Sequence, residues 1–170
     1  MYSNKNLVFL GMMGSGKSSI GNLVSKKLGL PFIDIDNLIV ISAGMSVSEI
    51  FDKRGEDYFR NLEEKITLKA LKKITGVVSL GGGGFMNAKI RKEILTNHFS
   101  FWLNWHDSIL LSRIKGSRKR PLALKSSDQE IKQLIKKRSK IYSKAQFKIN
   151  CNKLTKNEIV KKIIKIYELN

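Results

Sequence analysis

The sequence predicts an α/β fold in one domain, with a parallel sheet covered by helices on both faces. Short apolar runs alternate along the chain with segments of helical periodicity, the pattern of repeated strand–helix units. A length of 170 residues suits one domain, spanning 1–170. A chain of this length can bury enough surface to form a core without a metal or a disulfide, and the 42% apolar content agrees.

The first third of the chain predicts a strand, a glycine loop and a helix. Residues 7–10 are a continuous apolar run that ends at Gly11, and a helical pattern begins near Ser18 and stops at Gly29. A second buried strand is expected over residues 32–36.

The middle of the chain continues the alternation. Ser46 and Glu49 form a capping box before a helical pattern, which Gly55 is expected to stop. Two further strands are expected over residues 77–80 and 99–103.

The C-terminal part adds two helices and a fifth strand. Asp128 is the predicted N-cap of one helix, and Thr155 with Glu158 forms a capping box before the last helix. Residues 147–149 supply the fifth strand. Residues 112–128 fit no element, and a charged stretch of that length is usually functional or disordered.

The charge of the chain favours anionic partners. Lysine and arginine number 32 against 14 aspartate and glutamate, which gives a net charge of +18. Phosphates, carboxylates, nucleic acid and anionic lipid would all suit this charge, and a lysine-rich surface with no specific partner explains it equally well. The basic residues are spread over many segments and aromatic residues are only 8%, so we expect no nucleic-acid partner.

Other classes of protein are excluded by simple patterns. The longest apolar runs, such as residues 38–41, are far shorter than the roughly 18 residues of a membrane span, and no export signal is recognisable, so we expect no membrane partner. Cys151 is the only cysteine, which rules out an intramolecular disulfide and a cysteine-rich zinc site. We expect a cytoplasmic protein.

The glycine loop carries the strongest chemical signal. Residues 11–18 read G-x-x-x-x-G-K-S between a predicted strand and a predicted helix. Such glycines let backbone N–H groups point at phosphate oxygens, while Lys17 would meet the β- and γ-phosphates and Ser18 would ligate Mg²⁺. The motif predicts binding of ATP or GTP; the alternative is a glycine turn without a ligand.

Two carboxylates and a second glycine run follow later strands. If the second strand continues through Asp34 and Asp36, their side chains lie on one face at the ligand-binding edge of the sheet. They could hold Mg²⁺ through water and orient or deprotonate an acceptor hydroxyl, or activate water in an NTPase. Alternatively they cap a helix that begins near Asn37. Residues 81–84 could expose N–H groups to a ligand or form a flexible loop.

Five motifs together resemble those of the shikimate kinases in order and spacing. They are the loop at 11–18, Asp34-x-Asp36, Phe59-Arg60-x-x-Glu63, Gly81-Gly82-Gly83 and Arg120-Pro121-Leu122. The resemblance implies a three-layer P-loop fold like that of nucleoside monophosphate kinases, with a central five-stranded parallel sheet. It further implies a substrate-binding segment near 33–61 and a lid near 112–126. The implied activity is transfer of the γ-phosphoryl group of ATP to the 3-hydroxyl of shikimate, on the way to chorismate and the aromatic amino acids.

The resemblance also implies roles for individual residues. The catalytic residues would be Lys17, Asp34, Asp36 and Arg120. ATP would be bound by Gly14, Ser15, Gly16, Lys17, Ser18, Ser19, Arg113 and Arg120, with Arg113 where the family packs an arginine over adenine. Shikimate would be bound by Asp36, Arg60, Gly82 and Arg138. Mg²⁺ would be held by Ser18 and, through water, by Asp34. The resemblance carries the expectation of a monomer that uses Mg²⁺.

Chemistry supports this assignment, and alternatives stay open. Planar guanidinium groups bind a carboxylate bidentately, which would fix the direction of shikimate. Read alone, Arg60 could form an ion pair with Glu64, and Arg138 could belong to a basic helix face. Lys140 replaces the proline of the family's R-x-P-L-Y motif, which here reads Arg138 to Tyr142. A gluconate kinase of the same fold, a nucleic-acid-binding ATPase and a catalytically silent relative are the competing hypotheses.

Overall fold

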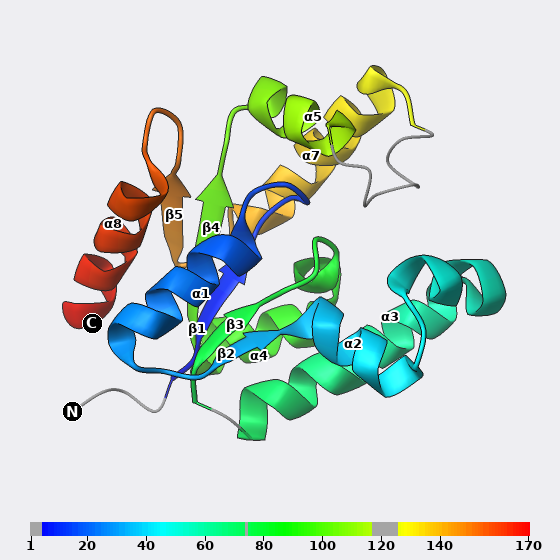
Figure 1. Cartoon of the computed structure of the whole chain (residues 1–170), viewed down its shortest axis with the longest axis horizontal. Helices are drawn as coiled ribbons and strands as arrows, with labels where there is room; N and C mark the ends of the chain where they lie inside the picture. The colour runs from blue at the N-terminus through cyan, green and yellow to red at the C-terminus, as the bar shows by residue number, and fades with distance from the viewer. Residues whose placement is uncertain (1–4, 74, 117–125) are drawn as a thin grey trace.

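Five parallel strands in the order β2-β3-β1-β4-β5 form the centre of the structure (Figure 1). The structure is a computed structural model that describes residues 5–73, 75–116 and 126–170. The strands are β1 Leu7–Leu10, β2 Phe32–Asp34, β3 Val77–Ser79, β4 Phe99–Asn104 and β5 Phe147–Asn150.

Helices connect these strands and cover the sheet. They are α1 Lys17–Leu28, α2 Ile35–Ala43, α3 Val47–Lys73, the 3₁₀ helix η1 Gly84–Met86, α4 Ala88–Asn97, α5 Asp107–Lys115, α7 Asp128–Tyr142 and α8 Lys156–Glu168. None of the helices in the described ranges is long and apolar enough to cross a membrane.

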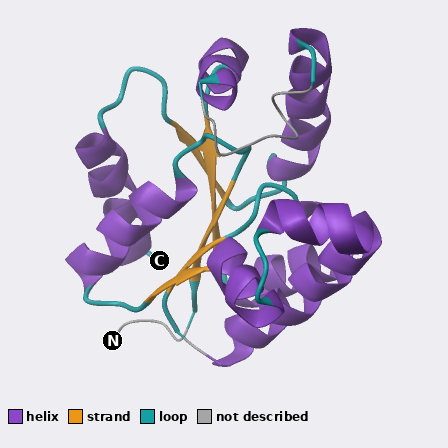
Figure 2. Cartoon of the chain, turned by 45° about the vertical axis from the view of Figure 1, so that its right-hand side comes forward, coloured by secondary structure: helices purple, strands orange, loops and turns teal. Residues whose placement is uncertain are grey.

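The core has two halves, one on each face of the sheet. Val8 and Leu10 of β1 point into the half that contains α2, α3, α4, α5 and α7. Leu7 and Phe9 point the other way, toward α1 and α8, because successive side chains of a strand face opposite sides. Figure 2 shows helices on both sides of the strands. The predicted three-layer α/β fold with a five-stranded parallel sheet is confirmed.

Local signals placed most helix ends correctly. Ser46 with Glu49 and Thr155 with Glu158 both form the predicted reciprocal capping bonds. Gly55 interrupts α3 with φ 80° and ψ 172°, a backbone conformation suited to glycine, so the predicted stop is a kink within a longer helical segment.

Two predicted boundaries were wrong. The second strand ends at Asp34, whose carboxylate accepts the N–H of Asn37 at 3.3 Å and caps α2, so Asp36 lies in a helix and does not share a strand face with Asp34. In α7 the N-cap is Ser127 rather than Asp128. Ser127 is preferred because it exchanges two hydrogen bonds with Glu130, whereas a cap at Asp128 would lack that partner.

The strand order predicts a ligand-binding site at the carboxyl end of β1. From β1 the chain first builds β2 and β3 on one side and later builds β4 and β5 on the other. In open parallel sheets, ligands bind at the carboxyl edge where the connections diverge in this way. The glycine loop at 11–16 leaves β1 at this point.

Candidate active site

The glycine loop between β1 and α1 has the conformation that the motif predicts. Gly11, Gly14 and Gly16 have φ values of 143°, 82° and 88°, which favour glycine because a Cβ would be strained there. Gly16 is the N-cap of α1. The loop therefore turns directly into a helix N-terminus, where N–H groups and the helix dipole attract phosphate.

Lys17 lies at the bottom of this loop. It is 9% exposed, and its ammonium group donates to the carbonyl oxygens of Gly11 at 3.0 Å and Met12 at 3.1 Å. A cavity of about 250 Å³ opens beside it. The cavity is lined by the predicted residues Gly14, Gly16, Lys17, Ser18, Ser19 and Asp36. Ser15 is fully buried behind the loop.

At the start of α1, the side-chain oxygens of Ser18 and Asp34 lie next to each other. The Ser18 hydroxyl donates to Asp34 Oδ2 at 2.5 Å and lies 3.3 Å from the Ser79 hydroxyl. Asp34 thus caps α2 with one carboxylate oxygen and contacts Ser18 with the other. Both interpretations of Asp34, as a cap and as part of the site, are compatible with this geometry.

A larger cavity of about 460 Å³ adjoins the first. Its lining includes all four residues predicted to bind substrate: Asp36, Arg60, Gly82 and Arg138. Asp36 and Gly82 also line the smaller cavity, so the two spaces meet at these residues. Phe51 and Phe59, whose rings lie 4.7 Å apart, give the larger cavity an apolar wall.

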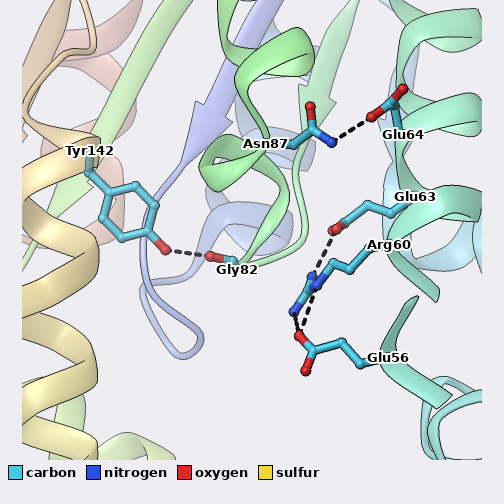
Figure 3. A network of polar contacts seen from close by, with 7 residues as sticks. All are labelled: Glu56, Arg60, Glu63, Glu64, Gly82, Asn87 and Tyr142. Atoms are coloured by element: carbon cyan, nitrogen blue, oxygen red, sulfur yellow. Dashed lines mark hydrogen bonds and ion pairs between the residues drawn. The ribbon is translucent and has the colours of Figure 1, made fainter. Parts of the chain in front are cut away.

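Arg60 is held in place by two carboxylates of its own helix (Figure 3). Its Nη1 donates to Glu63 at 2.8 Å, while Nε and Nη2 donate to Glu56 at 3.2 and 3.1 Å. The alternative of an ion pair with Glu64 was wrong, because Glu64 faces α4 and accepts from Asn87 and Lys89. The guanidinium group therefore meets the cavity in a fixed orientation.

Glu63 is the main site residue whose role the sequence did not reveal. It is 2% exposed and lines the larger cavity beside Arg60. Burial raises the pKa of its carboxyl group, and nearby Asp36 raises it further, while the hydrogen bond from Arg60 opposes both. The sequence signals were its place in the motif Phe59-Arg60-x-x-Glu63, which gave it no role, and its spacing of three residues from Arg60, at which helical side chains can pair.

The glycine run brings bare backbone against these charged groups. A Cβ on Gly81 would lie 2.6 Å from Asp36 Oδ1 and 2.8 Å from Glu63 Oε1, and one on Gly83 would lie 2.4 Å from Arg60 Nη1. Only glycine allows so close an approach without displacing these side chains. The alternative of a merely flexible loop does not explain these contacts.

Arg138 and Tyr142 face the same glycine run from α7. A Cβ on Gly82 would lie 3.5 Å from Arg138 Nη1, and the Tyr142 hydroxyl donates to the carbonyl oxygen of Gly82 (Figure 3). Burial raises the pKa of Tyr142 to about 12, so the hydroxyl keeps its proton and remains a donor at neutral pH. Helical spacing places both side chains on one face of α7.

Arg113 lies over the outer side of the glycine loop. Its guanidinium carbon is 3.9 Å from the ring centre of Trp105, and its Nη1 is 3.4 Å from the carbonyl oxygen of Gly14. Trp105, which belongs to none of the five motifs, donates its indole N–H to the carbonyl oxygen of Ser15. Arg120 and most of the predicted lid lie outside the described residues.

Comparison with known proteins points to one family. The family model for shikimate kinase matches residues 13–168. A shikimate kinase from Thermodesulfovibrio yellowstonii is 39% identical over 165 residues, which cover 96% of this chain and 95% of that protein. One from Sulfurihydrogenibium sp. is 40% identical over 161 residues, covering 94% of this chain and 96% of the relative.

Solved structures lead to the same family. The shikimate kinase from Acinetobacter baumannii, in complex with shikimate, superposes with a TM-score of 0.91 at 27% identity and covers 98% of this chain and 94% of its own. A gluconokinase from Sinorhizobium meliloti gives a TM-score of 0.61 at 18% identity over 99% of this chain and 94% of its own, which shows a shared fold alone. The resemblance that five sequence motifs predicted is thereby confirmed: the chain belongs to the shikimate kinase family, the ATP-dependent P-loop kinases of the shikimate pathway.

Proposed function

We propose that the two adjoining cavities bind ATP and shikimate, and that the γ-phosphoryl group passes between them to the 3-hydroxyl of shikimate. The observation that carries the proposal is the position of Asp36, which lines the phosphate-loop cavity and also the cavity that holds Arg60 and Arg138. Phosphoryl transfer needs a donor phosphate and an acceptor hydroxyl held in line. A carboxylate shared by both spaces suits that need.

Arg60 and Arg138 bind the carboxylate of shikimate. They come from α3 and α7 and line one cavity, so the anion is held from two directions. Arg60 is already oriented by Glu56 and Glu63, which reduces the conformational entropy lost on binding. The N–H of Gly82, whose carbonyl Tyr142 fixes from behind, adds a donor in the same pocket.

Asp36 orients the acceptor hydroxyl and takes its proton as the new bond to phosphorus forms. The carboxylate lies in the first turn of α2, where the partial positive charge of the helix N-terminus attracts an anion. Phosphoryl transfer depends mostly on positioning, so the orienting role of Asp36 is the larger part of its contribution.

Lys17 and the N–H groups of the glycine loop bind the phosphates of ATP. Lys17 stabilises the negative charge that spreads over the transferring group, and Arg120 joins it from a lid near 112–126. Arg113 lies beside the adenine. Residues 33–61 supply the substrate-binding segment, and closure of the lid keeps water away from the γ-phosphate.

The side-chain oxygens of Ser18 and Asp34 beside the loop are suitable ligands for Mg²⁺. Mg²⁺ prefers oxygen ligands and keeps several waters, so one or two protein groups plus phosphates suffice. The Ser18 hydroxyl and the Asp34 carboxylate, 2.5 Å apart, meet that description, with Ser18 as the direct ligand and Asp34 acting through water. Bound Mg²⁺ would offset the negative charge of the phosphates during transfer.

The decisive experiment compares acceptors. ADP formation is measured with shikimate, with gluconate and with neither, and the position of the new phosphate is assigned by NMR. We expect rapid turnover with shikimate alone and phosphate on the 3-hydroxyl. Turnover of gluconate without shikimate would favour the runner-up kinase, and turnover stimulated by an oligonucleotide would favour a nucleic-acid-dependent ATPase.

Two variants separate the roles. Asp36→Asn keeps the shape of the side chain but removes the base, so kcat should fall by about 100-fold or more, while the affinity for ATP stays unchanged. Arg60→Ala should chiefly weaken shikimate binding, and calorimetry that finds wild-type affinity would contradict its assignment. The same proposal includes a monomeric protein in the cytoplasm. The thiol of Cys151 is free and buried, which suits a reducing compartment.

A further inference from the structure

Trp105 lies just after β4, where the chain turns toward α5. We propose that Trp105 is a positioning residue for the nucleotide, because its indole holds both the Ser15–Gly16 peptide of the phosphate loop and the guanidinium group of Arg113. The inference rests on the proposed nucleotide site. It adds to that site a residue that touches neither reacting group.

The first contact fixes the direction of a backbone N–H. The indole Nε1–H donates to the carbonyl oxygen of Ser15 at 2.9 Å. In a planar trans peptide the C=O and the following N–H point in opposite directions. Holding the Ser15 carbonyl on the outer side therefore turns the Gly16 N–H toward the cavity that Gly16 and Lys17 line.

The hydrogen bond is needed because of the backbone at this position. Gly16 has a φ of 88°, and glycine has more rotational freedom than any other residue. Without a restraint on the preceding carbonyl, this peptide could rotate and turn its N–H away from a phosphate. The indole N–H of Trp105, which directly follows β4, restrains it.

The second contact holds Arg113 over the loop. Its guanidinium carbon lies 3.9 Å from the indole ring centre, well inside the roughly 6 Å range of cation–π attraction. The same guanidinium donates to the carbonyl oxygen of Gly14 at 3.4 Å. Trp105 and Arg113 thus bind two successive carbonyls of the phosphate loop from outside.

Together these contacts prepare the loop before the nucleotide arrives. Donors that are already oriented need no reorganisation when charge arrives or moves. Trp105 also covers one face of the exposed Arg113 guanidinium group and leaves its opposite face for a purine. Trp105 thereby affects nucleotide affinity without contacting shikimate, whose predicted ligands line the other cavity.

Two substitutions separate the contacts. Trp105→Phe keeps an aromatic face for Arg113 but loses the indole N–H, and Trp105→Leu loses both. Trp102→Phe is the matched control, because it makes the same change at the chain's other tryptophan, which is 5% exposed in the core. For each variant, calorimetry gives the dissociation constant of ADP, steady-state kinetics give KM for ATP and for shikimate, and circular dichroism gives Tm.

We expect the dissociation constant of ADP to rise about fivefold in Trp105→Phe and about twentyfold in Trp105→Leu, as loss of one hydrogen bond and one stack implies. KM for shikimate should stay within about twofold of wild type. Arg113→Ala combined with Trp105→Leu should weaken ADP binding by less than the product of the two single effects, because both act through the same stack.

Other results would overturn the inference. Wild-type ADP affinity in Trp105→Leu would show that the loop needs no such support. Equal rises in both KM values together with a lower Tm would make Trp105 a residue of the general fold. If the wild-type chain bound no ADP, or if Lys17→Ala left binding unchanged, the proposed nucleotide site would fail as well, and the two failures are thereby told apart.

Discussion

Gly83→Ala offers a sharp test of the shikimate pocket, because the added methyl group meets one particular atom. Gly83 has φ −98° and ψ −16°, a conformation that alanine adopts without strain. The new Cβ would lie 2.4 Å from Arg60 Nη1, whereas an ordinary contact is about 3.5 Å. The guanidinium group must therefore move by about 1 Å.

That movement separates fold from function. The Arg60 guanidinium group is the flexible end of a long side chain, so the fold can absorb the shift. Because the buried Glu63 carboxylate loses a hydrogen-bond donor, we expect the free energy of unfolding to fall by about 1 to 3 kcal/mol, which leaves the chain folded. The same shift breaks the 2.8 Å bond to Glu63 that orients Arg60. A misplacement of about 1 Å can cost up to about 100-fold in rate. We expect kcat/KM for shikimate to fall about 10- to 100-fold, which corresponds to about 1.4 to 2.7 kcal/mol.

The assay couples ADP release to NADH oxidation, with shikimate and ATP varied separately. Gly84→Ala is the matched control, since its Cβ would meet Glu63 Oε1 at 3.4 Å and Leu80 Cβ at 3.7 Å, both ordinary contacts. We expect KM for ATP to stay at its wild-type value in both variants. Wild-type KM for shikimate in Gly83→Ala, or an equal loss in Gly84→Ala, would refute the reasoning.

Three further predictions test other parts of the chain. Lys17→Ala should reduce ADP formation by about 100-fold or more, because it removes the cation at the phosphates; a rate assay with Tm as control checks this. Tyr142→Phe leaves the Gly82 carbonyl without its donor and should raise KM for shikimate about fivefold, at a stability cost of about 1 to 2 kcal/mol in urea melts; an unchanged KM would leave the bond with a purely structural role. Burial lowers the pKa of His98 below 6.5, and its Nδ1 accepts the Asn6 N–H at 3.2 Å. Neutral His98 therefore adds to the free energy of unfolding above pH 6.5, and this contribution is lost as the pH falls through the lowered pKa of His98. His98→Gln should decline less in Tm than wild type over that range, and parallel Tm curves would contradict the assignment.

Features that depend on neighbouring residues could be predicted from the sequence. The phosphate loop needs glycines at positive φ followed by a helix start, and both signals lie within residues 11–18. The two capping boxes likewise involve residues only three apart. Strands β1, β3 and β4 were recognisable because strands buried on both faces form continuous apolar runs. The edge strand β5 instead alternates between exposed and more buried positions.

Features that depend on distant segments could not. Whether Arg60 pairs with Glu63 or Glu64 is decided by what each side of α3 faces: Glu64 meets Asn87 at the start of α4, and Glu63 meets the glycine run. Helical spacing permits both pairs. Trp105 likewise reads as an ordinary apolar residue until the fold brings it within 2.9 Å of the Ser15 carbonyl.

The large positive charge of the chain does not explain which substrate it takes. The charged residues that line the larger cavity, within the described part of the chain, are Asp36, Arg60, Glu63, Glu130 and Arg138, two positive groups against three negative ones, although the chain carries +18 overall. An anion therefore gains little from the local net charge and must be held by directed bonds from the two guanidinium groups. A guanidinium group held in a fixed orientation binds a carboxylate well only in one orientation. In-line transfer to a single hydroxyl requires such a fixed orientation of the substrate. Within the part of the chain that the structure describes, no lysine lines this cavity. Those lysines can raise the rate of encounter with anions but cannot select among them.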